Sequence, residues 1–296
     1  MNRILIVSCM LALSVKAHSQ VFENIRLEDN LFQVKSQVID ISDYTKLIRV
    51  DPPVFPLAKN DEQHLIAYNV KLKSGVIEKV VFTFSDNKLT FIECRGNVLN
   101  ALTKNRANKS QSYLNYQVFI NDLLFVDYNQ DAAWFLTQES VHPNLFTWNN
   151  PLLENQELSY EPSAKLPKFI TMEDDLEILE SLFKKESRIL QKDTLDGSDH
   201  NAQIQLNAFG IEYAGFPRKF EARFGDGKLN TLWILTAKGE EDRIRQKLIT
   251  EYGHPIFLNE KWEFFSDWTV ALRKDTPEVL FLSTSQALNY KNSLSK

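Results

Sequence analysis

The sequence predicts an α+β protein built from two similar domains, each an antiparallel sheet with one principal helix, joined by a linker and a further helix. Three observations lead to this fold class. Residues 80–89 (VVFTFSDNKL) resemble residues 220–229 (FEARFGDGKL), 140 positions later, as alternating strands that enter an acidic two-residue turn. A helical pattern follows the second strand in each half, and further strands then close each half. We therefore expect an internal duplication, with two independent domains that share common hairpin chemistry as the alternative.

The first 19 residues predict an export signal peptide. Arg3 gives a positive start, residues 4–15 are nearly all apolar, and small residues follow at the spacing of a cleavage site. We expect cleavage after Ser19, or after Ala17 as an alternative, so the mature chain of a bacterium would lie in the periplasm or outside the cell. Lipid attachment at Cys9 is disfavoured, because a signal core normally has about 7 to 15 apolar residues and a much shorter run precedes this cysteine.

Charge and cysteine content restrict the classes of partner. The chain carries a net charge of −5, and removal of the signal changes this to −7, since Arg3 and Lys16 are lost. A negative chain disfavours nucleic acid and anionic lipid as partners. No later apolar run is long enough to span a membrane. Cys94 is left as a single cysteine, so the mature chain must be stabilised by a hydrophobic core and not by an internal disulfide.

The first domain is expected at residues 20–150. Alternating apolar residues predict short strands at 31–34 and 37–41, and prolines between residues 51 and 56 predict an extended loop. Next come a strand at 65–72, a turn at Ser74 and Gly75, the strand that ends at the Asp86 turn, and a short helix within residues 96–104. Strands at 118–127 and 132–137 close this domain.

A linker is expected at residues 151–170 and the second domain, with its leading helix, at residues 171–296. Thr171 can cap that helix with Asp174 in a capping box, and its apolar stripe is Leu176, Leu179, Phe183 and Leu190. Residues 239–252 show the clearest helical pattern, which begins with three acidic residues and stops at a glycine. Strands at 262–272 and 278–284 close the domain.

The sequence lacks the spacings that identify common enzymes. It has no nucleophile elbow, zinc-protease helix, phosphate loop or dinucleotide fingerprint. Its nine glycines leave little material for loops that bind phosphate closely. The acidic cluster from Asp193 to His200 does not have the spacing of an EF-hand and is interpreted as a solvated turn. We predict no catalytic residue, no metal site and no cofactor.

Histidine, cysteine and acidic side chains give no further site. The histidines of the mature chain, His64, His142, His200 and His254, are scattered along the sequence. Cys94 lies in a strand and is interpreted as a buried apolar residue. The acidic triplets at 173–175 and 240–242 are explained by the positive ends of helices.

Tryptophans are the candidates for contact with a ligand or partner. If residues 262–272 form one strand, Trp262 and Trp268 share a face with Phe264, Val270 and Leu272, and that face is either core or a contact surface. If Ser266 and Asp267 interrupt the strand, the two tryptophans separate. Trp134 and Trp148 present the same alternatives in the first half.

The function predicted on this basis is that of a non-catalytic envelope protein, exported and acting as a binding or interaction module. It would act through a sheet surface or the cleft between the halves on an unidentified protein or carbohydrate. The alternatives are a periplasmic hydrolase with a site between the two halves, where distant carboxylates or histidines converge, and a structural component of the envelope.

Overall fold

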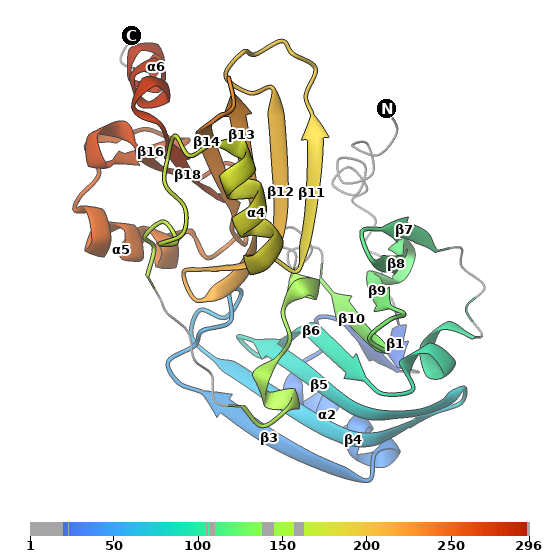
Figure 1. Cartoon of the computed structure of the whole chain (residues 1–296). Coiled ribbons are helices and arrows are strands. Elements are labelled where there is room, and N and C mark those ends of the chain that lie inside the picture. The colour runs from blue at the N-terminus through green and yellow to red at the C-terminus, as the bar shows by residue number, and fades with distance from the viewer. Residues whose placement is uncertain are drawn as a thin grey trace.

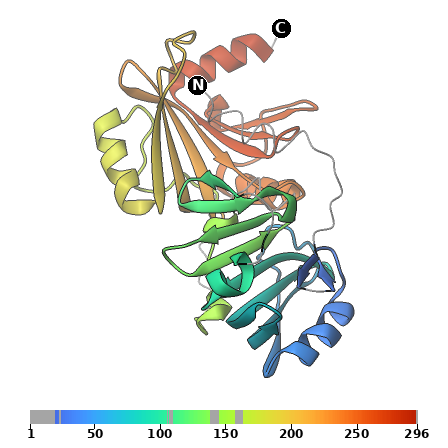
Figure 2. The same ribbon diagram turned by 90° about the vertical axis from the view of Figure 1, so that its right-hand side faces the viewer.

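The computed structural model describes residues 20–22, 24–104, 106, 110–137, 145–156 and 163–294. The predicted export signal and His142 lie outside these residues. The chain forms two halves, the blue-to-green half below and the yellow-to-red half above in Figure 1. Figure 2 shows the same two halves from the side, again one above the other. Each half is dominated by one antiparallel sheet, which confirms the α+β class.

The first half contains an eight-stranded sheet in the order β3-β4-β5-β6-β10-β9-β8-β7. A ribbon of β1 (Gln20–Phe22) and β2 (Ile25–Arg26) and helix α2 (Leu31–Ile41) precede it. The strands are β3 (Tyr44–Val50), β4 (Glu62–Leu72), β5 (Gly75–Ser85), β6 (Lys88–Arg95), β7 (Gln111–Tyr113), β8 (Tyr116–Phe119), β9 (Leu124–Asp127) and β10 (Ala132–Leu136). Two short helical turns interrupt them, η1 (Leu99–Thr103) and η2 (Ile120–Asp122).

The second half contains an eight-stranded sheet in the order β11-β12-β13-β14-β18-β17-β16-β15. The turns η3 (Leu145–Thr147) and η4 (Pro151–Leu153) and helix α4 (Leu176–Glu186) lead into it. The strands are β11 (Ile189–Thr194), β12 (Ile204–Tyr213), β13 (Phe216–Gly225), β14 (Lys228–Leu235), β15 (Phe257–Leu258), β16 (Trp262–Phe265), β17 (Val270–Arg273) and β18 (Glu278–Leu282). Helix α5 (Glu241–Tyr252), the turn η5 (Ser266–Trp268) and helix α6 (Thr284–Leu294) complete the half.

The two sheets have the same strand order when β3 is matched with β11 and each later strand with its counterpart. The central hairpin of each half, β5–β6 or β13–β14, also has the same register shift and the same type of turn. The β5–β6 register shifts between Thr83 and Phe84, and the β13–β14 register shifts between Arg223 and Phe224. The turns that follow use positive φ at two successive residues in both halves, which is the geometry of a type I′ hairpin turn.

A second correspondence lies at the entry to the first helix of each half. Glu28 and Glu173 both have φ 73°, and their backbone amides donate to Leu89 and Leu229 at 2.8 and 2.9 Å. The chain then turns into α2 or α4, which are both 11 residues long. The two entry segments are residues 25–31 (IRLEDNL) and 170–176 (ITMEDDL). In each half, the turn before the first helix is therefore held by a backbone hydrogen bond to the second strand of the central hairpin, which is β6 or β14.

The prediction of strands at 31–34 and 37–41 is wrong, because these residues form helix α2. Val34 and Val38 are fully buried one helical turn apart, so the apolar residues follow a helical period and not the period of two. Asn30 accepts from the Gln33 amide at 3.0 Å, and Gln33 Oε1 accepts from the Asn30 amide, so a capping box starts the helix.

Two predicted long strands are interrupted. The strand at 118–127 breaks at η2, where Leu123 has φ 47°. The strand at 262–272 breaks at η5, where Asp267 has φ 50°. The prediction of an uninterrupted strand is therefore wrong, and the alternative break at Ser266 and Asp267 is present. The two tryptophans nevertheless do not separate, because Trp262 and Trp268 both pack against Phe264. Trp262, Phe264 and Trp268 pack with α6, whereas Val270 and Leu272 face the opposite core.

The other three predicted helices are present, but their first and last residues differ from those predicted. Residues 239–252 form α5 from Glu241 onward, and the short helix within 96–104 is the five-residue turn η1. Asp174 accepts from the Thr171 amide at 2.8 Å, but the residue at the N-cap of α4 is Asp175. Leu190 lies in β11, outside the helical stripe. Helix α6 had no counterpart among the sequence predictions.

Other elements pack on both faces of each sheet. In the first half α2, the β1–β2 ribbon and η1 cover one face around Phe82 and Phe135, and Phe55 and residues 145–153 pack on the second face. In the second half α4 and α5 cover one face around Phe183 and Phe220, and α6 covers the other. Of the described helices, none has the length and apolar character to cross a bilayer.

Candidate binding site between the two halves

An aromatic cluster joins the two halves. Phe55 of the first half and Trp148 of the connecting segment (residues 145–156) contact Phe216, which opens β13, and Phe91 packs against both Phe55 and Trp148. Ring centroids lie 5.6 Å apart for Phe55 and Phe216 and 5.3 Å apart for Trp148 and Phe216. All four side chains are buried. This packing makes the β12–β13 end of the second sheet a fixed neighbour of the first half.

A cavity of about 430 Å³ lies beside this cluster. Its lining comes from the end of β6, the connecting segment, the residue before β11 and the β12–β13 hairpin of the second half. The lining residues are Arg95, Trp148, Asn149, Asn150, Pro151, Leu153, Glu154, Gln156, Arg188, Gly210, Glu212, Gly215, Phe216 and Pro217. Its volume is within the usual range of small-molecule sites.

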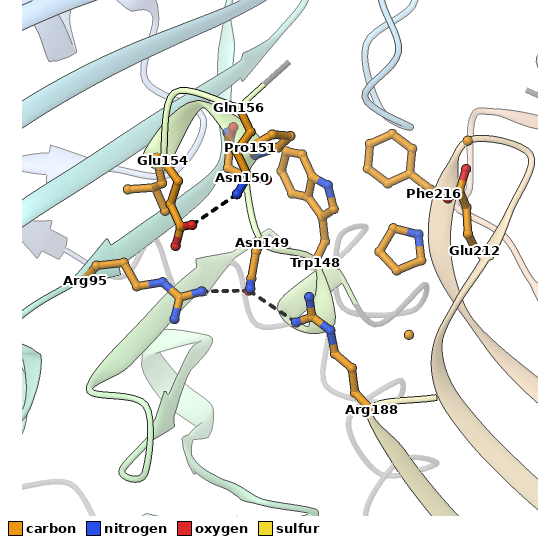
Figure 3. A pocket seen from close by; sticks show the side chains of 14 residues that line it. Arg95, Trp148, Asn149, Asn150, Pro151, Glu154, Gln156, Arg188, Glu212 and Phe216 are labelled. Carbon is orange, nitrogen blue, oxygen red and sulfur yellow. Dashed lines mark hydrogen bonds between the residues drawn. The ribbon is translucent and has the colours of Figure 1, made fainter. Parts of the chain in front are cut away.

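Two arginines from different halves meet at one amide in this cavity (Figure 3). Arg95 Nη2 donates to Asn149 Oδ1 at 2.6 Å, and Arg188 Nη1 donates to the same oxygen at 3.2 Å. Arg95 ends β6 and Arg188 directly precedes β11. Both positions are therefore set by strand ends, which favours a well-defined geometry.

Arg188 reaches Asn149 because Gly210 leaves room for its stem. Gly210 has φ 89° at the β-bulge of β12, and a Cβ there would lie 3.0 Å from Arg188 Cγ. An alanine would therefore be strained in its backbone and would displace the arginine. The bulge thus positions one of the two cations.

Behind Arg95 lies the buried carboxylate of Glu93. Its two oxygens accept from Arg95 and, at 2.6 Å, from the backbone amide of Asn150. Complete burial raises the pKa of Glu93 to about 7, because loss of hydration outweighs the opposing effects of Arg95, the Asn150 amide and Arg188. The carboxylate next to the cavity therefore titrates near neutral pH.

A second buried polar array continues from Asn150 into the first sheet. His64 Nε2 lies 2.7 Å from Glu62 Oε1, and His64 Nδ1 lies 3.0 Å from Thr83 Oγ1 and 3.1 Å from Asn150 Nδ2. These contacts are all satisfied by the tautomer with its proton on Nε2. A carboxylate, an imidazole and a hydroxyl are thus aligned as in acid–base catalysis, but Glu62, His64, Thr83 and Asn150 are each at most 1% exposed. In this state the array joins the connecting segment to the sheet and contacts no solvent.

The four tryptophans predicted as contact residues are in different environments. Trp148 lines the cavity, with 5% of its surface exposed. Trp134 is 1% exposed beneath Arg95, and Trp268 is 8% exposed among Phe257 and Phe264. Trp262 is half-buried and packs against Trp233 and Tyr290. The structure therefore does not bring all four together: Trp262 and Trp268 share one cluster, whereas Trp134 and Trp148 belong to another. Of the four, Trp148 lines the cavity and Trp262 is the most exposed.

The remaining polar candidates do not assemble into a site. Within the described residues, no three histidine, cysteine, aspartate or glutamate side chains are grouped as metal ligands would be. Asp196 and His200 lie in the exposed β11–β12 connection, and His254 is exposed after α5. Cys94 is fully buried in β6, and burial raises the pKa of its thiol.

Glu240 has a partner that the sequence did not indicate. Its carboxylate lies 2.6 Å from Arg218 Nη1, and neither side chain is exposed to solvent. It also accepts from the Ala237 amide and from Arg243. The helix dipole alone therefore does not explain this member of the acidic triplet.

Comparison with known proteins gives no relative. No protein-family model matches the chain, and searches of curated proteins and of solved structures found no match.

Sequence reasoning missed Arg95, Arg188 and Asn149, which form the hydrogen-bonded group in the cavity. Each is a common surface residue with no motif around it. One signal was available. The Asn149–Asn150–Pro151 step resembles a cap before a turn, and Asn150 does cap η4 by accepting from the Leu152 amide at 3.0 Å. This fixes the segment but does not reveal which cations reach it.

Proposed function

We propose that this protein is an exported, non-catalytic binding protein that holds its ligand in the cavity between the two halves. The observation that carries the proposal is the convergence of Arg95 and Arg188, from separate halves, on the exposed side chain of Asn149 in a cavity walled by aromatic residues. Such a combination of a few oriented polar groups with apolar walls is typical of small-molecule sites. The ligand is a small molecule or a short segment of a protein or carbohydrate partner.

Filling the cavity tests this proposal. Gln156 is exposed in the lining, so Gln156→Trp should occupy the cavity without disturbing a core. Gln191→Trp, at an exposed position on β11 outside the lining, is the matched control. Native mass spectrometry of protein recovered from its own envelope should detect a retained ligand on the parent chain and on the control but not on Gln156→Trp. Retention of the same ligand by all three proteins would exclude the cavity as the site.

Export rests on the sequence of the first 19 residues. We propose that the mature chain begins at Gln20 and lies in the periplasm or outside the cell. Mass spectrometry of the intact protein from fractionated cells tests this, and a cytoplasmic protein that retains Met1 or Arg3 would contradict it.

A common origin of the two halves is also proposed. It is supported by the same strand order, the same position of the register shift, and the same hydrogen-bonded turn before α2 and α4. A chimera that carries residues 170–176 in place of 25–31 should fold with a similar melting temperature. Loss of the folded state in this chimera would count against equivalent roles for the two segments.

The second candidate function is a hydrolase, which is favoured by the alignment of Glu62, His64 and Thr83 next to the cavity. It would require an opening that exposes Thr83. Hydrolysis of an ester or amide substrate that is lost in Thr83→Val, with unchanged thermal stability, would establish this function in place of the first.

A further inference from the structure

A neutral oxygen lies where two positive charges converge. Asn149 Oδ1 accepts from both Arg95 and Arg188, at 2.6 and 3.2 Å. Guanidinium groups form their strongest pairs with carboxylates, whose two oxygens match the planar donor fork. The amide oxygen thus occupies the position that a carboxylate oxygen would satisfy better.

The charges of the two arginines are compensated unequally. Arg95 is paired with Glu93 at 2.7 Å. Arg188 is exposed, and among the residues that the structure describes no carboxylate lies within ion-pair distance of it. An added anion would therefore gain most from Arg188, while Arg95 would orient it.

Asn149 can give up this position without disturbing the fold. Its side chain is exposed, whereas its neighbour Asn150 is buried and fixed by the Glu93, His64 and Thr83 contacts. Rotation of one amide side chain would open the space between the guanidinium groups.

On the basis of the proposed function, we infer that the ligand carries a carboxylate, and that its oxygens replace Asn149 Oδ1 between Arg95 and Arg188. Glu154 and Glu212 also line the cavity. A second anionic group on the ligand would meet these carboxylates, so the rest of the ligand is neutral or cationic. The carboxylate comes from an amino acid or peptide terminus or from an acidic sugar.

Calorimetric titration with matched pairs of probes tests the inference and separates the two sources. The pairs are alanyl-alanine against its carboxyl-terminal amide, and galacturonic acid against its methyl ester. One free acid should bind, and its neutral derivative should not. Arg188→Gln should weaken that binding roughly tenfold or more, because a charge-assisted pair is lost. Arg49→Gln removes a charge from a side chain that is 66% exposed on β3, outside the lining, and should leave the affinity unchanged.

Substitution of Asn149 gives a readout that requires no added ligand. Asn149→Asp places a tethered carboxylate between the two arginines, so it should raise the melting temperature above that of Asn149→Ala and weaken binding of the free acid. Asn149→Ala removes the competing amide oxygen and should bind the acid at least as tightly as the parent chain. A melting temperature of Asn149→Asp at or below that of Asn149→Ala would contradict the inference.

Failure of the inference can be distinguished from failure of the proposed function. If Gln156→Trp abolishes retention of the native ligand and Arg188→Gln does not, the cavity is the binding site and the carboxylate inference is wrong. If neither variant changes retention, both are wrong. Equal binding of acid and neutral derivative, or no binding of either acid, also overturns the inference.

Discussion

Glu93 links the stability of the protein to pH through one buried carboxylate. Its folded-state pKa of about 7 lies above the usual value of 4.5, because burial disfavours the charged form. Between these values the folded state binds the proton more tightly than the unfolded state. Stability therefore falls as the pH rises from about 4.5 through 7, by on the order of 3 kcal/mol, and stays low above 7.

Glu93→Gln should remove this dependence, since glutamine does not titrate. The free energy of unfolding, measured by denaturant titration at several pH values from 4.5 to 8, should fall more steeply for the parent chain than for Glu93→Gln. Glu260→Gln, at an exposed position after β15, is the control and should follow the parent. Parallel curves for Glu93→Gln and the parent would show that Glu93 ionises as an ordinary carboxylate.

The pair of Arg218 and Glu240 is the second prediction at this scale. Both side chains are inaccessible to solvent, and their nearest atoms lie 2.6 Å apart. Glu240→Gln would leave the buried guanidinium without a counter-charge, so we expect a loss of about 3–5 kcal/mol in unfolding free energy. Asp242→Asn removes an exposed carboxylate from the same helix turn and should cost less than about 1 kcal/mol. Equal costs would mean that the helix dipole accounts for both residues.

Among the elements, the helices α2 and α4 begin with the same turn but are capped differently. Asn30 accepts from the Gln33 amide in a capping box, whereas the Asp175 side chain makes no capping hydrogen bond. Asn30→Ala should therefore lower the unfolding free energy by about 1 kcal/mol. Asp175→Ala should lower it by less, since its exposed ion pair with Lys228 contributes little. Thermal or denaturant unfolding measures both, and a larger cost for Asp175→Ala would contradict this ranking.

The same two helices show what could be predicted at the element scale. Residues 31–41 contain two short alternating runs, which favour strands when each is considered alone. Val34 and Val38 are instead one turn apart on a single buried face, and the Asn30–Gln33 spacing marks the helix start. The hairpins were predictable because their turn residues tolerate positive φ. The break at η2 was not, since Leu123 has positive φ without being a typical turn residue. The break at η5 was foreseen as an alternative, because Ser266 and Asp267 are residues that turns favour.

At the scale of the whole molecule, the cavity depends on contacts across long sequence separations. Arg95 and Arg188 are far apart in the chain, and they meet because the connecting segment carries Asn149 between two sheets. Periodicity and turn motifs describe only residues that are close in sequence. The sequence therefore predicted the two halves and a cleft between them, but not which arginines would lie in that cleft. Trp148 was named as a candidate because a tryptophan is either core or contact surface, and it is buried in the aromatic cluster while it lines the cavity.

The aromatic cluster at the interface should make the two halves unfold together. Phe216 belongs to the second sheet but is buried against Phe55 and Trp148, so either half would expose large apolar surface without the other. We expect one cooperative thermal transition for the parent chain. Phe216→Ala should cost about 3–5 kcal/mol and, because it removes the shared contacts, should resolve two transitions in scanning calorimetry. Phe183→Ala deletes an equally buried ring within the second half alone, and it should lower stability without altering the coupling across the Phe216 contacts. Two transitions in the parent chain, or a single one in Phe216→Ala, would show that the cluster does not couple the halves.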